Sequence, residues 1–314
     1  MRIVVAEFMD EAAVALLTSR FDTRYDATLV DRRPDLLVEV GFADALIVRN
    51  RVRVDSELLA AAGGLKVVGR LGVGLDNIDL PGCEARGIEV IPATGANALA
   101  VAEYVIAVTL VLLRGAYFGT AAVAAGQWPR AKLSNGREIA GKTLGVVGFG
   151  SIGRMTAKLA RGLGMRVLAF DPQIVASASV WAEHETVSRS LDGVLREADV
   201  VSLHVPLIRA THHLVDATRL ALMKREAVLI NTSRGGIVAE DALAAALRDN
   251  RLAGAALDVF ENEPLPAGSP LAGCPNLILT PHIAGVTRES NQRVSSLIAE
   301  KVAAALQARQ GSAP

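Results

Sequence analysis

Three apolar segments in the last third of the chain each end in a side chain that could do acid–base or anion chemistry. VLINTSRGG places Arg234 after one apolar run, and ALDVFENEP places Asp258 and Glu263 after the next. LILTPHIAG places His282 after the last. In an open parallel sheet, ligands bind outside the carboxyl ends of the strands. We therefore predict that a guanidinium, two carboxylates and an imidazole meet at one edge of a sheet.

A glycine-rich segment precedes these residues. GVVGFGSIGR supplies Gly148, Gly150 and Gly153 in a G-x-G-x-x-G pattern after an apolar run and before a helical one. Gly148 permits a tight turn, Gly150 lets a pyrophosphate approach the backbone, and Gly153 lets helix and strand pack closely. Asp171 follows 18 positions after Gly153, at the end of the next apolar run. A carboxylate there can bind ribose hydroxyls and repels a 2′-phosphate, which favours NAD over NADP.

Hydride transfer coupled to proton transfer is the chemistry that suits this set. Histidine is the natural acid and base near neutral pH, so His282 would move the proton of a 2-hydroxy acid. Glu263 would orient the ring, Arg234 would bind the substrate carboxylate, and Asp258 could hold the nicotinamide carboxamide. Each residue alone is commonly structural or solvated. Their occurrence together, beside a dinucleotide loop, favours a functional site.

Two series of strands and helices must position these residues. Residues 1–97 form one α/β series, with strands expected at 2–7, 45–50, 65–71 and 87–93 and helices at 10–21 and 55–64. The second series has strands expected at 143–148, 166–170, 199–204, 227–232, 254–259 and 277–280. A long apolar helix at 98–125 begins the second series, and a last helix at about 287–308 follows it.

These elements predict an α/β protein of two domains. A Rossmann-type doubly wound parallel sheet, residues 98–286, would be inserted into a smaller flavodoxin-like α/β domain made of residues 1–97 and 287–314. The helix at 98–125 is apolar nearly all round, which is typical of an interdomain connector or a dimer contact.

Composition excludes several classes of function. The net charge is zero, because 33 basic residues (Lys and Arg) balance 33 acidic ones (Asp and Glu). This balance argues against a nucleic-acid or membrane-surface partner. Only two cysteines occur, and MRIVVAEFMD is too short and acidic for a signal peptide, so we expect a cytoplasmic protein. The apolar stretch from Ala98 to Leu113 is short for a membrane span. We assign no metal-binding residues.

A basic segment bears on the substrate. VRNRVRV carries Arg49, Arg51 and Arg53, and Arg70 lies at the end of the next apolar run. An extended backbone would put the first three on one face. We interpret Arg53 as solvated and Arg49 and Arg70 as cleft residues. Such cations suit a substrate with a second anion, a sulfonate or a phosphate.

Seven motifs together resemble the D-isomer-specific 2-hydroxyacid dehydrogenases over nearly the whole chain. They are GRLGVGLDNID, ATGANALAVAEYV, GVVGFGSIGR, SLHVPL, INTSRGGIV, ALDVFENEP and TPHIAG. Within the family the chain most resembles the 3-phosphoglycerate dehydrogenase branch, whose relatives include sulfolactate dehydrogenases. The longer members carry a regulatory domain, and we expect none in the few residues that follow the last helix here.

The resemblance implies a homodimeric enzyme with its active site in the cleft between the domains. It implies that Arg234, Glu263 and His282 are catalytic, and that the backbone of Leu71, Gly72, Val73 and Gly74 holds the substrate carboxylate. The helix at 98–125 would be the dimerisation arm, with the tip near Trp128 approaching the partner's site. The cofactor contacts implied, besides the three glycines of the loop, are Val73, Ser151, Ile152, Asp171, His204, Val205, Pro206, Thr232, Ser233, Asp258 and Gly285.

The substrate stays open at this point. Sulfolactate is the first expectation, 3-phosphoglycerate the second, and a simple hydroxy acid such as glycerate, the partner of hydroxypyruvate, the third. The stereochemistry is not assigned. A different class, an NAD-sensing protein-binding module, is the main alternative, and the intact Arg234, Glu263 and His282 set favours the enzyme. Formate oxidation has no support, because Glu263 rather than a glutamine would pair with His282.

Overall fold

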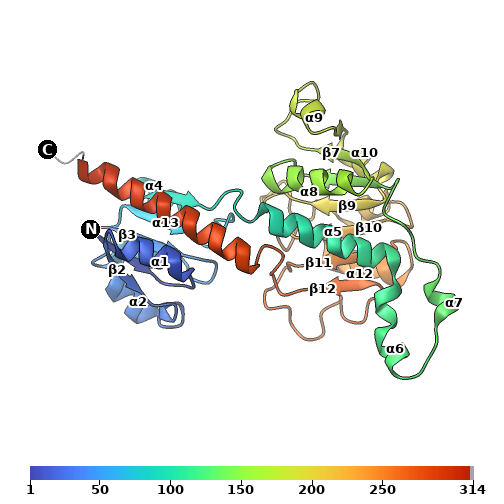
Figure 1. Cartoon of the computed structure of the whole chain (residues 1–314), viewed down its shortest axis with the longest axis horizontal. Coiled ribbons are helices and arrows are strands. Elements are labelled where there is room, and N and C mark those ends of the chain that lie inside the picture. Colours follow the sequence, from blue (N-terminus) through green and yellow to red (C-terminus); the bar gives the residue numbers. More distant parts are fainter. Residues whose placement is uncertain (312–314) are drawn as a thin grey trace. The chain divides into compact units, whose positions relative to one another are not determined.

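The computed structural model describes residues 1–311 of the chain. It divides into two compact units. Unit 1 comprises Met1–Asn97 together with the segment from Val286 onward, and unit 2 comprises Ala98–Gly285. Each unit contains its own parallel sheet, with helices packed on it (Figure 1). This arrangement confirms the predicted fold class.

The sheet of unit 1 has five strands in the order β2-β1-β3-β4-β5, all parallel. The strands are β1 (Arg2–Val5), β2 (Asp22–Tyr25), β3 (Ala45–Val48), β4 (Val67–Arg70) and β5 (Glu89–Pro92). The sequence did not indicate β2. Its residues, DTRY, are mostly polar and lie at the edge of the sheet, where burial does not demand an apolar run.

Two hydrophobic clusters cover the two faces of this sheet. Side chains alternate along β1, so Ile3 and Val5 face one cluster and Val4 faces the other. The first cluster includes side chains of α1 and α13, and the second includes those of α2 and α3. The helices are α1 (Glu11–Thr18), α2 (Arg33–Val40), α3 (Ser56–Ala61), α4 (Leu80–Ala85) and α13 (Arg288–Gly311), with a 3-10 turn η1 (Leu29–Asp31).

The sheet of unit 2 has seven parallel strands in the order β12-β11-β10-β9-β6-β7-β8. The order reverses at β6, as in a doubly wound fold. The strands are β6 (Thr143–Val147), β7 (Arg166–Phe170), β8 (Val187–Ser188), β9 (Val200–Leu203), β10 (Val228–Asn231), β11 (Gly254–Leu257) and β12 (Leu277–Leu279). Six were expected from the sequence; β8 was missed because two residues carry no periodic signal.

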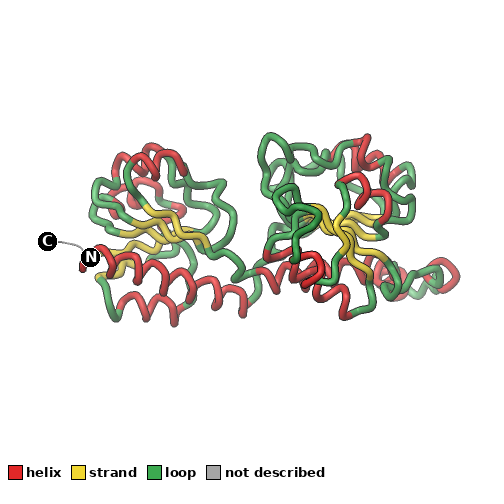
Figure 2. The backbone as a smooth tube through the Cα atoms, turned by 90° about the horizontal axis from the view of Figure 1, so that it is seen from above, coloured by secondary structure: helices red, strands yellow, loops and turns green. Residues whose placement is uncertain are grey.

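Helices cover both faces of the second sheet, as Figure 2 shows. One cluster packs α5 and α8 against it, and the other packs α10 and α12. The helices are α5 (Ala98–Arg114), α6 (Thr120–Ala124), α7 (Arg130–Leu133), α8 (Ser151–Gly162), α9 (Val180–Glu183), α10 (Leu191–Glu197), α11 (Ala217–Leu220) and α12 (Glu240–Arg248), with a 3-10 turn η2 (Ala116–Gly119).

The expected continuous helix at 98–125 is wrong in one respect. Gly115 has a φ of 66°, a left-handed conformation that ends α5 after Arg114. The chain continues through η2 and α6, bent by 63° from α5.

Among the described residues, no single helix is long and apolar enough to cross a membrane. The bent pair of α5 with residues 116–124 passes that test only when its two halves are taken together. Val101, Val105 and Leu112 of α5 are buried in the core of unit 2, which accounts for its apolar composition.

Candidate active site

The glycine loop connects β6 to α8 and has no room for larger residues at two positions. Gly148 has a φ of 93°, and a Cβ there would lie 2.3 Å from the carbonyl oxygen of His204. A Cβ on Gly153 would lie 2.2 Å from the carbonyl oxygen of Gly148. The position of a Cβ on Gly150 is open. The loop therefore leaves its outer backbone accessible beside the start of α8, where Ser151 and Ile152 lie, as a pyrophosphate requires.

Asp171 follows β7, and the structure places its carboxylate against the glycine loop. Its Oδ2 accepts the Phe149 N–H at 2.8 Å, and its Oδ1 accepts the Gln173 N–H at 2.9 Å. Phe149 is fully buried, with its ring centroid 5.0 Å from that of Trp181. Each carboxylate oxygen keeps a second lone pair, which a ribose hydroxyl can use. The acid and the loop thus fit a dinucleotide without a 2′-phosphate.

His204 lies at the end of the neighbouring strand β9, just before Val205 and Pro206. Its Nε2 is 2.9 Å from the hydroxyl oxygen of Ser202. Burial lowers the pKa of His204 to about 4. At neutral pH this imidazole is therefore uncharged, and it is poorly suited to carry a catalytic proton.

Arg234 lies in a tight turn that begins after β10 and includes Thr232 and Ser233. The buried Asn231 closes this turn, because its Nδ2 donates to the Arg234 carbonyl at 2.8 Å and its Oδ1 accepts the Ser233 N–H at 3.1 Å. A Cβ on Gly235 would lie 1.7 Å from the Phe260 carbonyl oxygen, so only glycine permits this close approach to the segment after β11. Arg234 Nη1 donates to the Ser233 carbonyl at 2.6 Å.

Glu263 and His282 form a direct pair. The Nδ1 atom of His282 lies 2.7 Å from Oε2 of Glu263, and the other oxygen of Glu263 accepts the Phe260 N–H at 3.1 Å. Both side chains are partly exposed, at 41% for His282 and 36% for Glu263. An exposed imidazole oriented by a carboxylate can pass a proton to a bound molecule through its second nitrogen.

Asp258 is 1% exposed and supports the loop that carries His282. Its Oδ1 accepts the Ile283 N–H at 2.8 Å and the Thr280 hydroxyl at 2.6 Å. Its Oδ2 accepts the Ala284 N–H at 2.7 Å. With three of about four lone pairs engaged, Asp258 has little remaining capacity for a cofactor contact.

Unit 1 holds the two arginines that are predicted to bind the substrate. Arg49 is largely buried, and its Nη2 donates to Oδ1 of Asn291 at 2.7 Å. Burial lowers the pKa of Arg49, and the charge of Glu7 opposes that shift. Arg70 is 9% exposed, and its Nη1 donates to the Leu71 carbonyl at 3.0 Å.

The glycine segment 71–74 follows β4 directly. A Cβ on Gly72 would meet the guanidinium of Arg70 at 1.7 Å, so glycine at this position makes room for the arginine. Leu71 is buried, whereas Val73 and Gly74 are partly exposed. Arg70 therefore contacts the segment whose backbone is predicted to bind the substrate carboxylate.

The segment after β3 is not extended, contrary to the prediction from its sequence, so its arginines do not share a face by simple alternation. The chain bends at residues 50–52 because the buried Glu7 carboxylate gathers backbone N–H groups there. Glu7 accepts from Arg49 at 2.7 Å, Val52 at 3.0 Å and Arg51 at 3.2 Å. Arg51 is exposed and pairs with Asp31, and Arg53 is exposed as expected.

Glu7 was not among the predicted site residues. Its sequence signal is an acid directly after the apolar run of β1, which is also the signal that identified Asp171. Its partners, however, lie 42 to 45 residues away along the chain. Only the folded structure brings them together.

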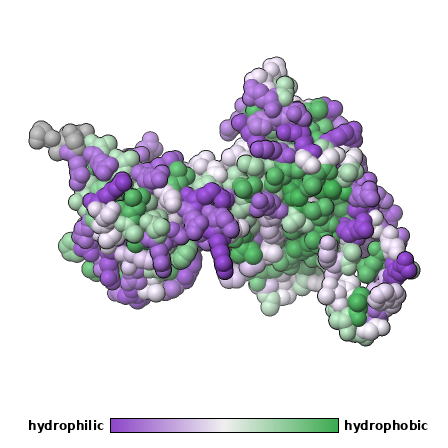
Figure 3. All heavy atoms as spheres, in the orientation of Figure 1, coloured by the Kyte–Doolittle hydropathy of each residue, from purple (hydrophilic) through white to green (hydrophobic). Residues whose placement is uncertain are grey.

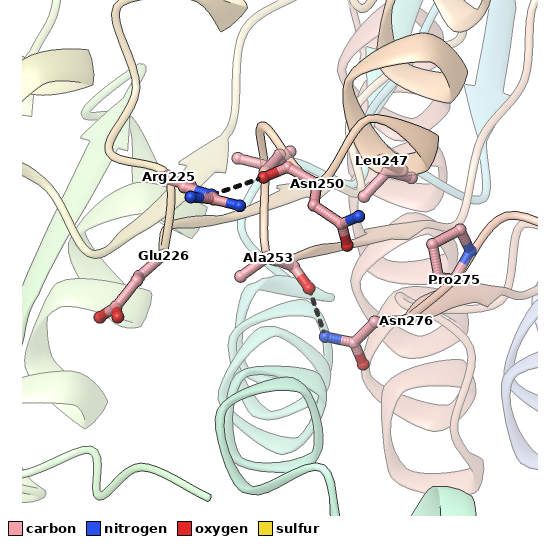
Figure 4. Close-up of a pocket in the computed structure, with 8 residues that line it drawn as sticks. Arg225, Glu226, Leu247, Asn250, Ala253, Pro275 and Asn276 are labelled. Carbon is pink, nitrogen blue, oxygen red and sulfur yellow. Dashed lines mark hydrogen bonds between the residues drawn. The ribbon is translucent and has the colours of Figure 1, made fainter. Parts of the chain in front are cut away.

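A cavity of about 360 Å³ lies at the other edge of the second sheet. Its lining comes from the segments that precede β10, β11 and β12, and Arg225 Nε there donates to the Asn250 carbonyl at 3.0 Å (Figure 4). This cavity lies at the amino ends of the strands, whereas Arg234, Glu263 and His282 follow their carboxyl ends. Among residues 1–311, no cluster of three or more His, Cys, Asp or Glu side chains is arranged to hold a metal ion.

The matching family model now identifies the class of protein. Residues 106–284 match the description "D-isomer specific 2-hydroxyacid dehydrogenase, NAD binding domain". The chain belongs to this family and is an NAD-dependent 2-hydroxyacid dehydrogenase.

Similar proteins agree with this assignment. The chain is 54% identical over 307 residues to (S)-sulfolactate dehydrogenase from Chromohalobacter salexigens, covering 98% of this chain and 99% of that protein. It is 36% identical to D-3-phosphoglycerate dehydrogenase from Methanocaldococcus jannaschii, over 96% of this chain but only 56% of the relative.

Solved structures match over nearly the whole chain. The TT0316 protein from Thermus thermophilus superposes with a TM-score of 0.86 at 37% identity, covering 98% of this chain and 97% of that one. The NAD-dependent formate dehydrogenase from Staphylococcus aureus, solved in complex with NAD, gives a TM-score of 0.80 at 28% identity, covering 96% and 94%.

Proposed function

We propose that the protein interconverts 3-sulfolactate and sulfopyruvate with NAD. The observation that carries this proposal is the 54% identity to (S)-sulfolactate dehydrogenase from Chromohalobacter salexigens, which extends over 98% of this chain and 99% of that protein. Arginines held in fixed positions in unit 1 add support, because a sulfonate needs a cation that does not lose its charge.

Three side chains of unit 2 carry out the reaction. NAD, when bound at the glycine loop, would supply the acceptor for the hydride that leaves the carbon carrying the hydroxyl. His282 removes the hydroxyl proton through Nε2, because its Nδ1 is engaged by Glu263 at 2.7 Å. Glu263 keeps the ring oriented and favours the imidazolium that results. Arg234 binds the substrate carboxylate and polarises the reacting oxygen.

Residues of unit 1 bind the rest of the substrate. Arg49 and Arg70 bind the sulfonate, and the backbone of residues 71–74 binds the carboxylate. The bonds of Glu7 to the segment around Arg49 support this role, because they hold the backbone of that arginine in place. The bond from Arg49 to Asn291 leaves other guanidinium N–H groups available for an oxyanion.

Binding of the cofactor uses the carboxyl edge of the second sheet. Gly148, Gly150 and Gly153 admit the pyrophosphate, and Asp171 binds the adenosine ribose. We propose contacts by the other predicted cofactor residues that keep free capacity, namely Val73, Ser151, Ile152, His204, Val205, Pro206, Thr232, Ser233 and Gly285.

A second substrate, 3-phosphoglycerate, is favoured by a separate observation. D-3-phosphoglycerate dehydrogenases match 96% to 97% of this chain at 36% to 42% identity. A phosphate would use the same two arginines. Hydroxypyruvate is the third candidate, since a hydroxypyruvate reductase from Thermotoga maritima is 34% identical over 96% of the chain.

We also propose that the protein forms a homodimer through α5 and the segment that follows it. This surface carries exposed apolar side chains, including Trp128 at 78% exposure and Tyr117 at 66%. Hydrophobic residues gather over the surface near α5 in Figure 3. A patch of this kind is typical of a protein interface.

We also propose a cytoplasmic location. Both cysteines are free thiols, which suits a reducing compartment.

The substrate is tested by NADH oxidation with sulfopyruvate, phosphohydroxypyruvate, hydroxypyruvate, pyruvate and glyoxylate. We expect kcat/KM to be highest for sulfopyruvate and to fall by at least about tenfold for substrates without a second anion. A highest value for phosphohydroxypyruvate would replace sulfolactate with phosphoglycerate. Equal values across the panel would remove Arg49 and Arg70 from substrate recognition.

A further inference from the structure

The loop that carries His282 has an unusual backbone. His282 has a φ of 56°, in the left-handed region that residues with a side chain seldom adopt. Such a conformation persists only when the surrounding structure enforces it. The positions of the neighbouring backbone groups therefore decide where the imidazole points.

The Asp258 carboxylate enforces this conformation from inside unit 2. The N–H groups of Ile283 and Ala284, the two residues after His282, donate to Asp258 at 2.8 and 2.7 Å. The His282 N–H itself donates to the Thr280 carbonyl at 3.0 Å. These three hydrogen bonds of the short loop therefore all end on Asp258 or Thr280.

Two hydroxyl groups fix the carboxylate in turn. The Thr280 hydroxyl oxygen lies 2.6 Å from Oδ1 of Asp258 and 2.6 Å from the Tyr104 hydroxyl oxygen. An ionised carboxylate can only accept, so the single hydroxyl proton of Thr280 is donated to Asp258. Tyr104 must then donate to Thr280. The direction of both hydrogen bonds is thereby determined.

Tyr104 suits the role of a permanent donor. It lies on α5 and is partly buried. Burial raises the pKa of its hydroxyl, the hydrogen bond with Thr280 opposes this shift, and the charge of Asp258 adds to it. Tyr104 therefore keeps its proton. Val101 and Val105, which flank it on α5, are buried in the core of unit 2. The chain of hydroxyls therefore starts from a rigid helix.

We propose that Tyr104 and Thr280 are positioning residues that hold His282 in its working orientation through the Asp258 carboxylate. Neither hydroxyl needs to touch the substrate. The proposal rests on the proposed function, in which His282 moves the proton. It adds that helix α5 supplies part of the rigidity that the His282 loop requires.

The test compares Thr280→Val and Tyr104→Phe with Thr280→Ser, which restores the hydroxyl. Thr109→Val and Tyr25→Phe are matched controls, because Thr109 is a fully buried threonine of α5 and the Tyr25 hydroxyl lies 3.4 Å from a backbone carbonyl in unit 1. We expect kcat for 2-oxo acid reduction to fall about ten- to hundredfold in the first two variants. Thr280→Ser and both controls should stay near wild type, and NADH affinity should change little.

The number of NADH sites per chain separates positioning from general loss of folding. Loss of the fold lowers kcat and the number of sites together, whereas a misoriented His282 lowers kcat and leaves the stoichiometry of NADH binding unchanged. Unchanged kcat in both variants would overturn the proposal, and so would a loss of sites that accounts for the whole loss of kcat. Equal losses in Thr109→Val would also overturn it.

Amide hydrogen exchange decides the same question without any substrate. The N–H groups of Ile283 and Ala284 should exchange faster in Thr280→Val than in Thr280→Ser or Thr109→Val. Should the wild type reduce no 2-oxo acid at all, the proposed function fails while this comparison still tests the positioning. Should exchange at both amides stay unchanged in an active enzyme, the positioning role is wrong and the proposed function stands.

Discussion

His282 Nδ1 lies 2.7 Å from Glu263 Oε2, and the two residues are 19 positions apart on segments that follow two neighbouring strands. Glu263 is itself anchored, because its other oxygen accepts the Phe260 N–H. The pair fixes which ring nitrogen carries a proton toward the carboxylate and leaves Nε2 for the substrate.

Replacing Glu263 by Gln should lower kcat for 2-oxo acid reduction about ten- to hundredfold, because the imidazolium loses its counter-charge. Steady-state kinetics with sulfopyruvate and NADH measure the effect. Glu261→Gln is the control, because Glu261 lies in the same loop but pairs with His213 instead. A Glu263→Gln kcat equal to that of the wild type would remove Glu263 from the reaction.

Arg49→Met should separate substrates by their second charge. We expect KM for sulfopyruvate to rise about tenfold or more, since a buried charge-assisted hydrogen bond is lost, while KM for pyruvate barely changes. Arg53→Met changes an exposed arginine nearby and serves as the control. An equal rise in KM for both substrates would show that Arg49 supports the fold rather than the sulfonate.

Asp171→Asn should weaken NADH binding and reduce the preference for NADH over NADPH, about tenfold in the ratio of dissociation constants. One of the two backbone hydrogen bonds to residue 171 can survive, because the amide oxygen of Asn still accepts. Fluorescence titration with each cofactor gives the ratio directly. Asp192→Asn, on α10, should leave it unchanged. An unaltered ratio in Asp171→Asn would contradict the ribose assignment.

The free energy of unfolding depends on pH through Glu240. Burial raises its pKa, the Glu261 N–H bond opposes this shift, and the charges of Glu261 and Asp241 reinforce it. The folded state therefore binds the Glu240 proton more tightly than the unfolded chain. Stability is lost as pH rises from the ordinary pKa of 4.5 through the folded value.

Glu240→Gln removes this loss, so the variant should be more stable than the wild type at about pH 7, with the difference shrinking at about pH 4. Urea unfolding at both pH values measures this, and Asp249→Asn, which changes an exposed acid after the last turn of the same helix, is the control. A wild type that is more stable than Glu240→Gln at neutral pH would contradict the assignment.

The sequence predicted the features that depend on local pattern. The glycine spacing of residues 148–153 and the apolar runs before Asp171, Glu263 and His282 are each readable within about ten residues. Parallel strands then bring the ends of those runs to one edge.

Other features depend on contacts that no local pattern contains. Strand β2 is polar because it lies at a sheet edge, and the break in the helix after Arg114 comes from the conformation of a single glycine within an apolar run. The bend around Arg49 is made by Glu7, and the hydroxyl contact from Tyr104 crosses 176 positions of sequence. Both require the folded core before they exist.

The proton transfer assigned to His282 is tested most directly by the turnover number of His282→Ala with sulfopyruvate and NADH. We expect kcat to fall about 10² to 10⁴-fold while the dissociation constant of NADH stays close to the wild-type value, because the imidazole takes part in proton transfer and not in holding the dinucleotide. Turnover within about twofold of the wild type would contradict the account, since removing an essential general acid cannot cost so little.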